Sequence, residues 1–97
     1  MPGLLDINSK GVQISASIAS ASAAIPLLGA TTMRVYNPSG ATCYVVTDVT
    51  APTATSANLP VGATPETFSV NPSHGFVAVI LSAGTGTIDI RFSVGGE

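Results

Sequence analysis

The feature that most constrains this chain is a strict alternation of apolar and polar residues from Thr87 to Val94. The apolar positions are Ile88, Ile90, Phe92 and Val94. A period of two over this length is typical of a β-strand with one buried face and one wet face. The preceding run, residues 76–81, is continuously apolar, as in a strand covered on both faces. The short, glycine-bearing segment 82–86 therefore predicts a hairpin between two strands.

Further apolar or alternating segments predict strands over residues 12–18, 33–37, 42–47 and 67–70. The turn Asn37-Pro38-Ser39-Gly40 predicts a second hairpin, because proline presets φ, glycine accepts a positive φ and asparagine bonds its own backbone. Two segments leave alternatives open. The Ala/Ser run 19–24 is either a strand or an irregular extension, and segment 48–65 is either a functional loop or conceals a short edge strand.

Together these segments predict an all-β fold with no helix. We expect a small antiparallel β-sandwich or jelly roll of six to seven strands, with a flattened barrel as the alternative. Residues 1–11 show no period and predict an extended N-terminal arm, or a frayed terminus with a few packed side chains. Residues 12–97 form a single β-sandwich domain in this interpretation.

The surface of such a domain must be unusually poor in charge. Charged residues make up 8% of the 97 residues, against about 25% in a typical globular protein. An apolar chain with so few charges tends to bury surface against a partner, so we expect a homo-oligomer or docking on a larger assembly. Three cations and a net charge of −2 argue against a phosphate-binding patch, and hence against nucleic acid as a partner.

Targeting features point to synthesis in a reducing cytoplasm. The first residues lack the basic and apolar regions of a signal peptide, and no apolar stretch is long enough for a membrane span. The single cysteine, Cys43, cannot form an internal disulfide.

The titratable residues predict no catalytic, metal or cofactor site. His74 lies in a turn without a local orienting carboxylate, and we expect it at the surface. Cys43 alternates with Tyr44 in a strand, so we expect it to be buried or at an interface rather than reactive. The carboxylates are scattered, and one histidine with one cysteine cannot form a zinc cage. The sequence therefore predicts a protein that is not an enzyme.

Other side chains are assigned by the same alternation. Asp89 and Arg91 share the wet face of the last strand and are expected to pair weakly. Tyr36 and Tyr44 flank the Asn37–Gly40 turn and are expected at a rim. Three aromatic residues are expected in the core: Phe68, Phe76 and Phe92.

Three segments, 35–45 (VYNPSGATCYV), 56–63 (SANLPVGA) and 83–87 (AGTGT), resemble a family of small β-sandwich proteins. Members of that family are encoded among the virion structural genes of tailed bacteriophages. The resemblance covers roughly residues 32–94 and rests on turn and strand motifs. It implies a capsid decoration, or cement, protein that is made in the host cytoplasm and sits on the virion surface. Such a protein binds the major capsid protein or other virion proteins and stabilises the shell by bridging capsomers.

The candidate partner-binding residues come from the two irregular parts of the chain. The N-terminal arm supplies Leu4, Leu5 and Ile7, and segment 48–65 supplies Pro52, Leu59 and Pro60. Two alternative functions stay open. One is a head–tail connector or another tail component, and the other is a receptor- or glycan-binding β-module.

Overall fold

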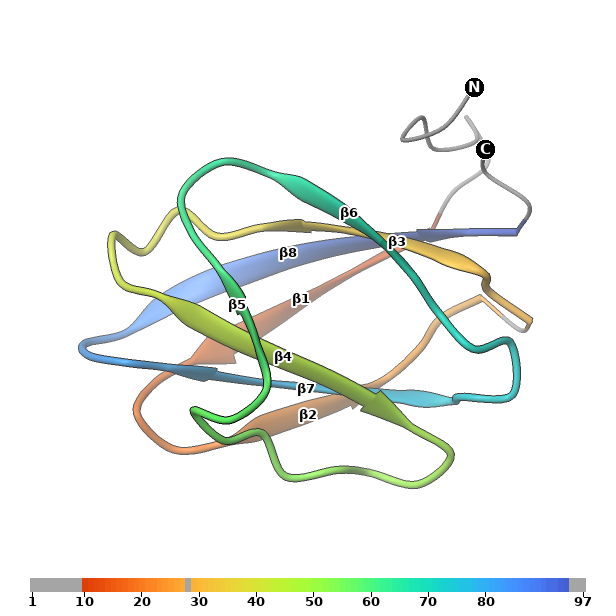
Figure 1. Cartoon of the computed structure of the whole chain (residues 1–97), viewed down its shortest axis with the longest axis horizontal. Helices are drawn as coiled ribbons and strands as arrows, with labels where there is room; N and C mark the ends of the chain where they lie inside the picture. Colours follow the sequence, from red (N-terminus) through yellow and green to blue (C-terminus); the bar gives the residue numbers. More distant parts are fainter. Residues whose placement is uncertain (1–9, 28, 95–97) are drawn as a thin grey trace.

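Eight β-strands and no helix make up the described part of the chain, residues 10–27 and 29–94 of a computed structural model. Figure 1 shows the strands as two stacked layers. In chain order they are β1 (Lys10–Ala16), β2 (Ala21–Ala24), β3 (Thr32–Tyr36), β4 (Cys43–Asp48), β5 (Leu59–Val61), β6 (Glu66–Ser69), β7 (Phe76–Leu81) and β8 (Gly86–Ser93).

Each layer is a four-stranded antiparallel sheet. Sheet A has the order β1-β8-β3-β6, and sheet B has the order β2-β7-β4-β5. The pairings are nested, because β1 pairs with β8, β2 with β7, β3 with β6 and β4 with β5. Eight strands nested in this way and divided between two sheets form a jelly roll. The expected all-β sandwich is confirmed, and of its two versions the jelly roll is the one observed.

The two predicted hairpins are wrong. β7 lies in sheet B and β8 in sheet A, and likewise β3 lies in sheet A and β4 in sheet B. Both connections therefore cross from one sheet to the other. Gly40 and Gly84 do adopt positive φ, at 83° and 71°, so the turn chemistry was identified correctly. An alternating strand only specifies that one face is buried, and it does not specify which sheet contains it.

The strand count is eight rather than six to seven, because both open segments contain a strand. The Ala/Ser run contributes β2, and segment 48–65 conceals the three-residue edge strand β5. The predicted arm is also two residues too long. Lys10 and Gly11 belong to β1 and pair with Phe92 and Arg91. Residues 1–9 of that arm lie outside the described residues.

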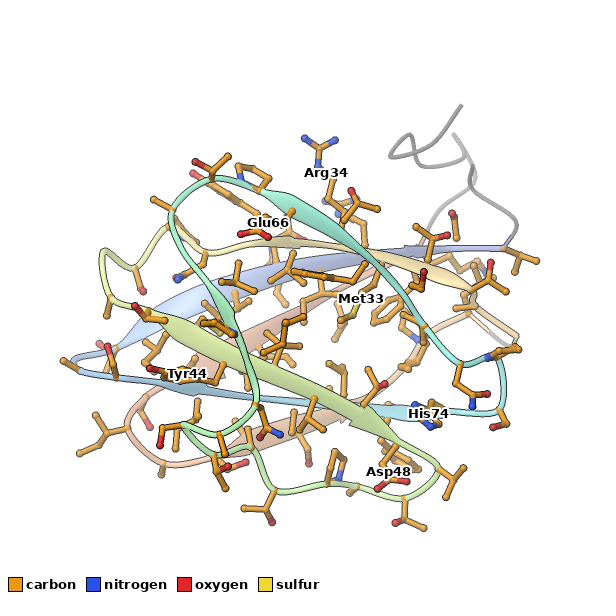
Figure 2. All side chains as sticks on the ribbon, in the orientation of Figure 1. Met33, Arg34, Tyr44, Asp48, Glu66 and His74 are labelled. Carbon is orange, nitrogen blue, oxygen red and sulfur yellow. The ribbon has the colours of Figure 1, made fainter. Side chains whose placement is uncertain are left out.

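The core lies between the sheets and confirms the alternation in the last strand. Ile88, Ile90 and Phe92 are completely buried, and Met33 lies between the two layers in Figure 2. The alternation fails at the end of β8, where Val94 is 52% exposed and Ser93 is fully buried. Position 94 lies beyond the last paired residue, so the sheet no longer directs its side chain inward.

The three phenylalanines do not share one environment. Phe92 is in the core, and Phe68 packs against it from β6. Phe76 was also expected in the core, but it lies on the outer face of sheet B, since Val77 and Val79 of the same strand point inward. When both faces of a strand are apolar, the sequence does not show which of its two alternating sets of side chains faces the core.

Two Asn-Pro-Ser turns connect strands, one joining β3 to β4 and the other joining β6 to β7. In each, the asparagine Oδ1 accepts hydrogen bonds from the backbone amide and hydroxyl of the serine two residues later, as in Asn37 with Ser39 and Asn71 with Ser73. Asn37 is fully buried, whereas Asn71 is exposed. Asn37 also donates from Nδ2 to the carbonyl oxygens of Ala41 at 2.6 Å and Val61 at 3.1 Å. All four of its hydrogen-bonding positions are thus used.

Candidate functional site

Charge is distributed unevenly between the two sheets. Of the six Asp, Glu, Lys and Arg residues in the described ranges, five lie on strands of sheet A: Lys10, Arg34, Glu66, Asp89 and Arg91. The sixth, Asp48, ends β4 at one end of sheet B. Figure 2 shows Arg34 pointing away from the body of the protein on the side of sheet A. The outer surface of sheet B is therefore almost free of charge.

The outer face of sheet B is apolar across three neighbouring strands. The register places Tyr44 beside Pro60 and Ile80, and Val46 beside Ala78. These positions alternate with the core residues of the same strands, so their side chains point away from the core. We call this set, with Phe76, the outer apolar face.

The connection from β4 to β5 covers part of this face. Figure 1 shows it running along the outside of sheet B. Ala54 at its centre is 1% exposed and donates a 2.8 Å hydrogen bond from its amide to Oγ of Ser20. Thr55 and Asn58 close a turn, with the Asn58 amide 3.0 Å from the Thr55 carbonyl oxygen and the Thr55 amide 2.7 Å from Asn58 Oδ1. The connection is thus an ordered covering segment.

An open groove lies between this covering segment and the sheet. It has a volume of about 420 Å³ and is lined by Ile18, Tyr44, Ala54, Thr55, Ser56, Ile80, Leu81 and Ser82. Ile18 is 68% exposed, which is the greatest exposure among the large hydrophobic side chains described. An exposed isoleucine beside a half-buried tyrosine and isoleucine makes an apolar surface that is suited to a partner.

The predicted contact residues in the described ranges lie on two different parts of the chain, the edge strand β5 and the covering segment. Leu59, 46% exposed, and Pro60 lie on the edge strand β5, where Pro60 adjoins Tyr44 of the outer apolar face. Pro52 is half-buried in the covering segment. Leu4, Leu5 and Ile7 lie outside the described residues.

The sequence interpretation missed Ile18, Tyr44 and Ile80 as members of one surface. The continuous apolar run 76–81 did indicate a strand with two apolar faces. We placed Tyr44 at a rim and did not identify it as the outward partner of Ile80. The pairing of β4 with β7 brings Tyr44 and Ile80 together, and a hydrogen bond from the Leu81 amide to the Ser17 carbonyl oxygen holds the neighbouring Ile18 beside them.

The outer face of sheet A has a different chemistry. The predicted pair is confirmed there, since Arg91 Nε lies 3.1 Å from Asp89 Oδ1. Arg34 is directly opposite Arg91 across the β3–β8 ladder, an arrangement in which like charges repel. Arg91 packs over Gly11 instead, so closely that a Cβ atom added at position 11 would lie 2.7 Å from Cδ of Arg91. Tyr36, 45% exposed, shares this polar face.

The two residues considered for catalysis are both engaged in structure. Cys43 is fully buried, and burial raises the pKa of its thiol to about 11 although a backbone hydrogen bond with Ile80 opposes the shift. A protonated, inaccessible thiol is not a nucleophile. His74 is half-buried rather than at the surface, and its Nδ1 lies 2.7 Å from Oγ1 of Thr47.

Within residues 10–27 and 29–94, no group of three or more His, Cys, Asp or Glu could hold a metal ion. The same ranges contain no helix of the length and hydropathy needed to cross a membrane. Comparison with known proteins identified no matching family model, curated protein or solved structure.

Proposed function

We propose that this protein is a non-enzymatic structural component of a phage virion, a capsid decoration protein that docks on the shell through the outer apolar face of sheet B. Binding there would bridge neighbouring capsomers and stabilise the shell. The partner in this proposal is the major capsid protein, and the contact on the partner is an uncharged, apolar patch that complements the groove around Ile18.

The single observation that carries the proposal is the contrast between the two outer faces. The outer face of sheet A carries three charged side chains, those of Arg34, Asp89 and Arg91. Sheet B instead presents Tyr44, Ile80 and the exposed Ile18 around an open groove. A protein that is polar on one side and apolar on the other is suited to sit on a larger surface, with its charged sheet toward water.

Two further features support the virion as the setting. Jelly rolls are frequent in capsid proteins, although the same fold also occurs in lectins and cupins, so this support is an analogy of fold. The turn and strand motifs at 35–45, 56–63 and 83–87 resemble those of phage virion proteins. On a shell with many equivalent positions, modest contacts at each site would persist through multivalency.

The test is cosedimentation with capsids assembled from the major capsid protein encoded in the same genome. We expect the purified protein to pellet with these capsids, to saturate at a fixed number of copies and to raise the temperature at which the shells disassemble. A genome without a major capsid protein, or a protein that stays in the supernatant at every concentration, would overturn the proposal. Retention on isolated tails in place of capsids would assign it to the tail or connector.

A second function has one observation in its favour. The groove places the half-buried ring of Tyr44 near hydroxyl groups of Thr55, Ser56 and Ser82, and a ring beside hydrogen-bonding groups is a suitable surface for a sugar. A glycan array separates the two proposals. Specific glycan binding that is lost in Tyr44→Ala would favour a receptor-binding module, and a blank array would leave docking on a protein shell as the function of the groove.

A further inference from the structure

The four edge strands of the sandwich differ in how they are protected against pairing with another chain. In sheet A, β1 begins with the charged Lys10, and β6 begins with the charged Glu66 directly after Pro65. In sheet B, β5 carries Pro60 at its centre. Charges and prolines are the usual devices that prevent edge-to-edge pairing. β2, the remaining edge, is Ala-Ser-Ala-Ala and has neither.

The outward backbone groups of β2 pair with no other strand in residues 10–27 and 29–94. The amide of Ile25 donates to the carbonyl oxygen of Gly75 at 2.8 Å, which continues the β2–β7 register and makes that position a hydrogen-bonded pair. Hydrogen-bonded pairs alternate along an antiparallel ladder. Ala21 and Ala23 therefore bond to β7, whereas Ser22 and Ala24 direct their N–H and C=O groups to the open edge. Both of these residues are exposed.

We propose that β2 pairs with β2 of a second copy of this chain about a twofold axis through Ala23. In this arrangement Ser22 of one copy forms a hydrogen-bonded pair with Ala24 of the other, and the symmetry repeats the pair. Such a self-complementary contact is the ordinary form of a twofold dimer. The ladder ends at Pro26, the next residue with an outward-directed nitrogen, because proline has no N–H to donate.

Pairing at this edge joins the two B sheets into one continuous eight-stranded sheet. The two outer apolar faces then lie side by side on one surface, while the charged A sheets stay on the opposite side. The dimer is made by this chain alone, so the inference goes beyond the proposed function and holds whether or not the partner is a capsid.

The test is the solution mass of the protein over a wide range of concentration, measured by light scattering after size exclusion. We expect a species of twice the 9.6 kDa of the chain. Ser22→Pro removes one outward N–H per copy without removing a bond to β7, so we expect the dissociation constant to rise by about tenfold or more. Ser22→Thr keeps the N–H and is the matched control, with a dissociation constant close to that of the wild type.

Amide hydrogen exchange locates the contact independently of the proline variant. The amides of Ser22 and Ala24 should exchange slowly in the dimer and quickly on dilution to monomer, while the amide of Ala23 is slow in both. A protein that stays at 9.6 kDa at millimolar concentration would overturn the inference. So would a dimer in which the Ser22 and Ala24 amides exchange quickly.

Discussion

Nδ2 of Asn37 donates a 3.1 Å hydrogen bond to the carbonyl oxygen of Val61, a residue 24 positions further along the chain. Both residues are completely buried. The bond attaches the turn between β3 and β4 to the edge strand β5. It thereby fixes the end of sheet B that carries Pro60 and Tyr44.

Replacement of Asn37 by alanine should lower the free energy of unfolding by about 2–4 kcal/mol, because the buried bond to the Val61 carbonyl oxygen and the part-buried bond to that of Ala41 are both lost. Asn71→Ala is the matched control. It removes the same local turn bonds from an exposed Asn-Pro-Ser turn, and we expect a loss below about 1 kcal/mol. Urea unfolding of the two variants gives both values. Equal losses would show that the contact with Val61 contributes nothing.

Asn37 also illustrates how far the sequence could be interpreted. Its role in a turn was predictable from Asn-Pro-Ser-Gly, since this chemistry is local. Its bond to Val61 was not, because the bond depends on β5 lying beside β4. The same limit explains the two wrong hairpins, in which the turn residues were identified correctly but the strands they join proved to lie in different sheets.

The candidate site was predictable to a similar degree. Leu59 and Pro60 were predicted as contact residues from their segment, and both are exposed; Pro60 lies beside Tyr44, which lines the groove, whereas Leu59 pairs with the core residue Val45. Ile18, Tyr44 and Ile80 come from three separate segments. The β4–β7 register places Tyr44 beside Ile80, and the bond from the Leu81 amide to the Ser17 carbonyl oxygen holds Ile18 next to them. Alternation determines which face of a strand is buried, and pairing determines which residues share the other face.

Gly86→Ala should destabilise the protein by about 1–3 kcal/mol, because overpacking forces the backbone to move. A Cβ at position 86 would lie 2.6 Å from Cβ and 3.2 Å from Cα of Ser39, where the β3–β4 turn packs on β8. Gly62→Ala is the control, since a Cβ at that position meets nothing within 4 Å. Thermal unfolding should show a lower midpoint for the first variant only. A Gly86→Ala protein as stable as the wild type would mean that the turn does not pack on β8.

Cys43 should make stability depend on pH in the alkaline range. Burial raises the thiol pKa from 9.0 to about 11, so the unfolded chain loses its proton first as the pH rises. The contribution of the protonated thiol to the free energy of unfolding is complete below pH 9.0 and is lost as the pH approaches about 11. The total loss is on the order of 2–3 kcal/mol. Cys43→Ala lacks this thiol. The difference in unfolding free energy between wild type and variant should therefore change over this interval, and a constant difference would contradict the assignment.

Ser20→Ala should loosen the covering segment. The Ala54 amide loses its 2.8 Å acceptor, so its hydrogen exchange should accelerate, with a loss of about 0.5–1.5 kcal/mol in global stability. The exchange of core amides in β8 serves as the internal reference and should change only by that global loss. Unchanged exchange at Ala54 would show that the hydrogen bond does not hold the segment on the sheet.

The most direct test of the account compares two aspartate variants on opposite faces for binding to capsids assembled from the major capsid protein of the same genome. Ile18→Asp places a charge beside the groove on sheet B, and Tyr36→Asp places one on the polar face of sheet A. Both side chains are exposed, so both variants should fold. We predict that Ile18→Asp weakens binding by about 30-fold or more, as expected at the centre of an interface, and that Tyr36→Asp binds like the wild type. Equal binding by the two variants, or a loss confined to Tyr36→Asp, would contradict docking through sheet B.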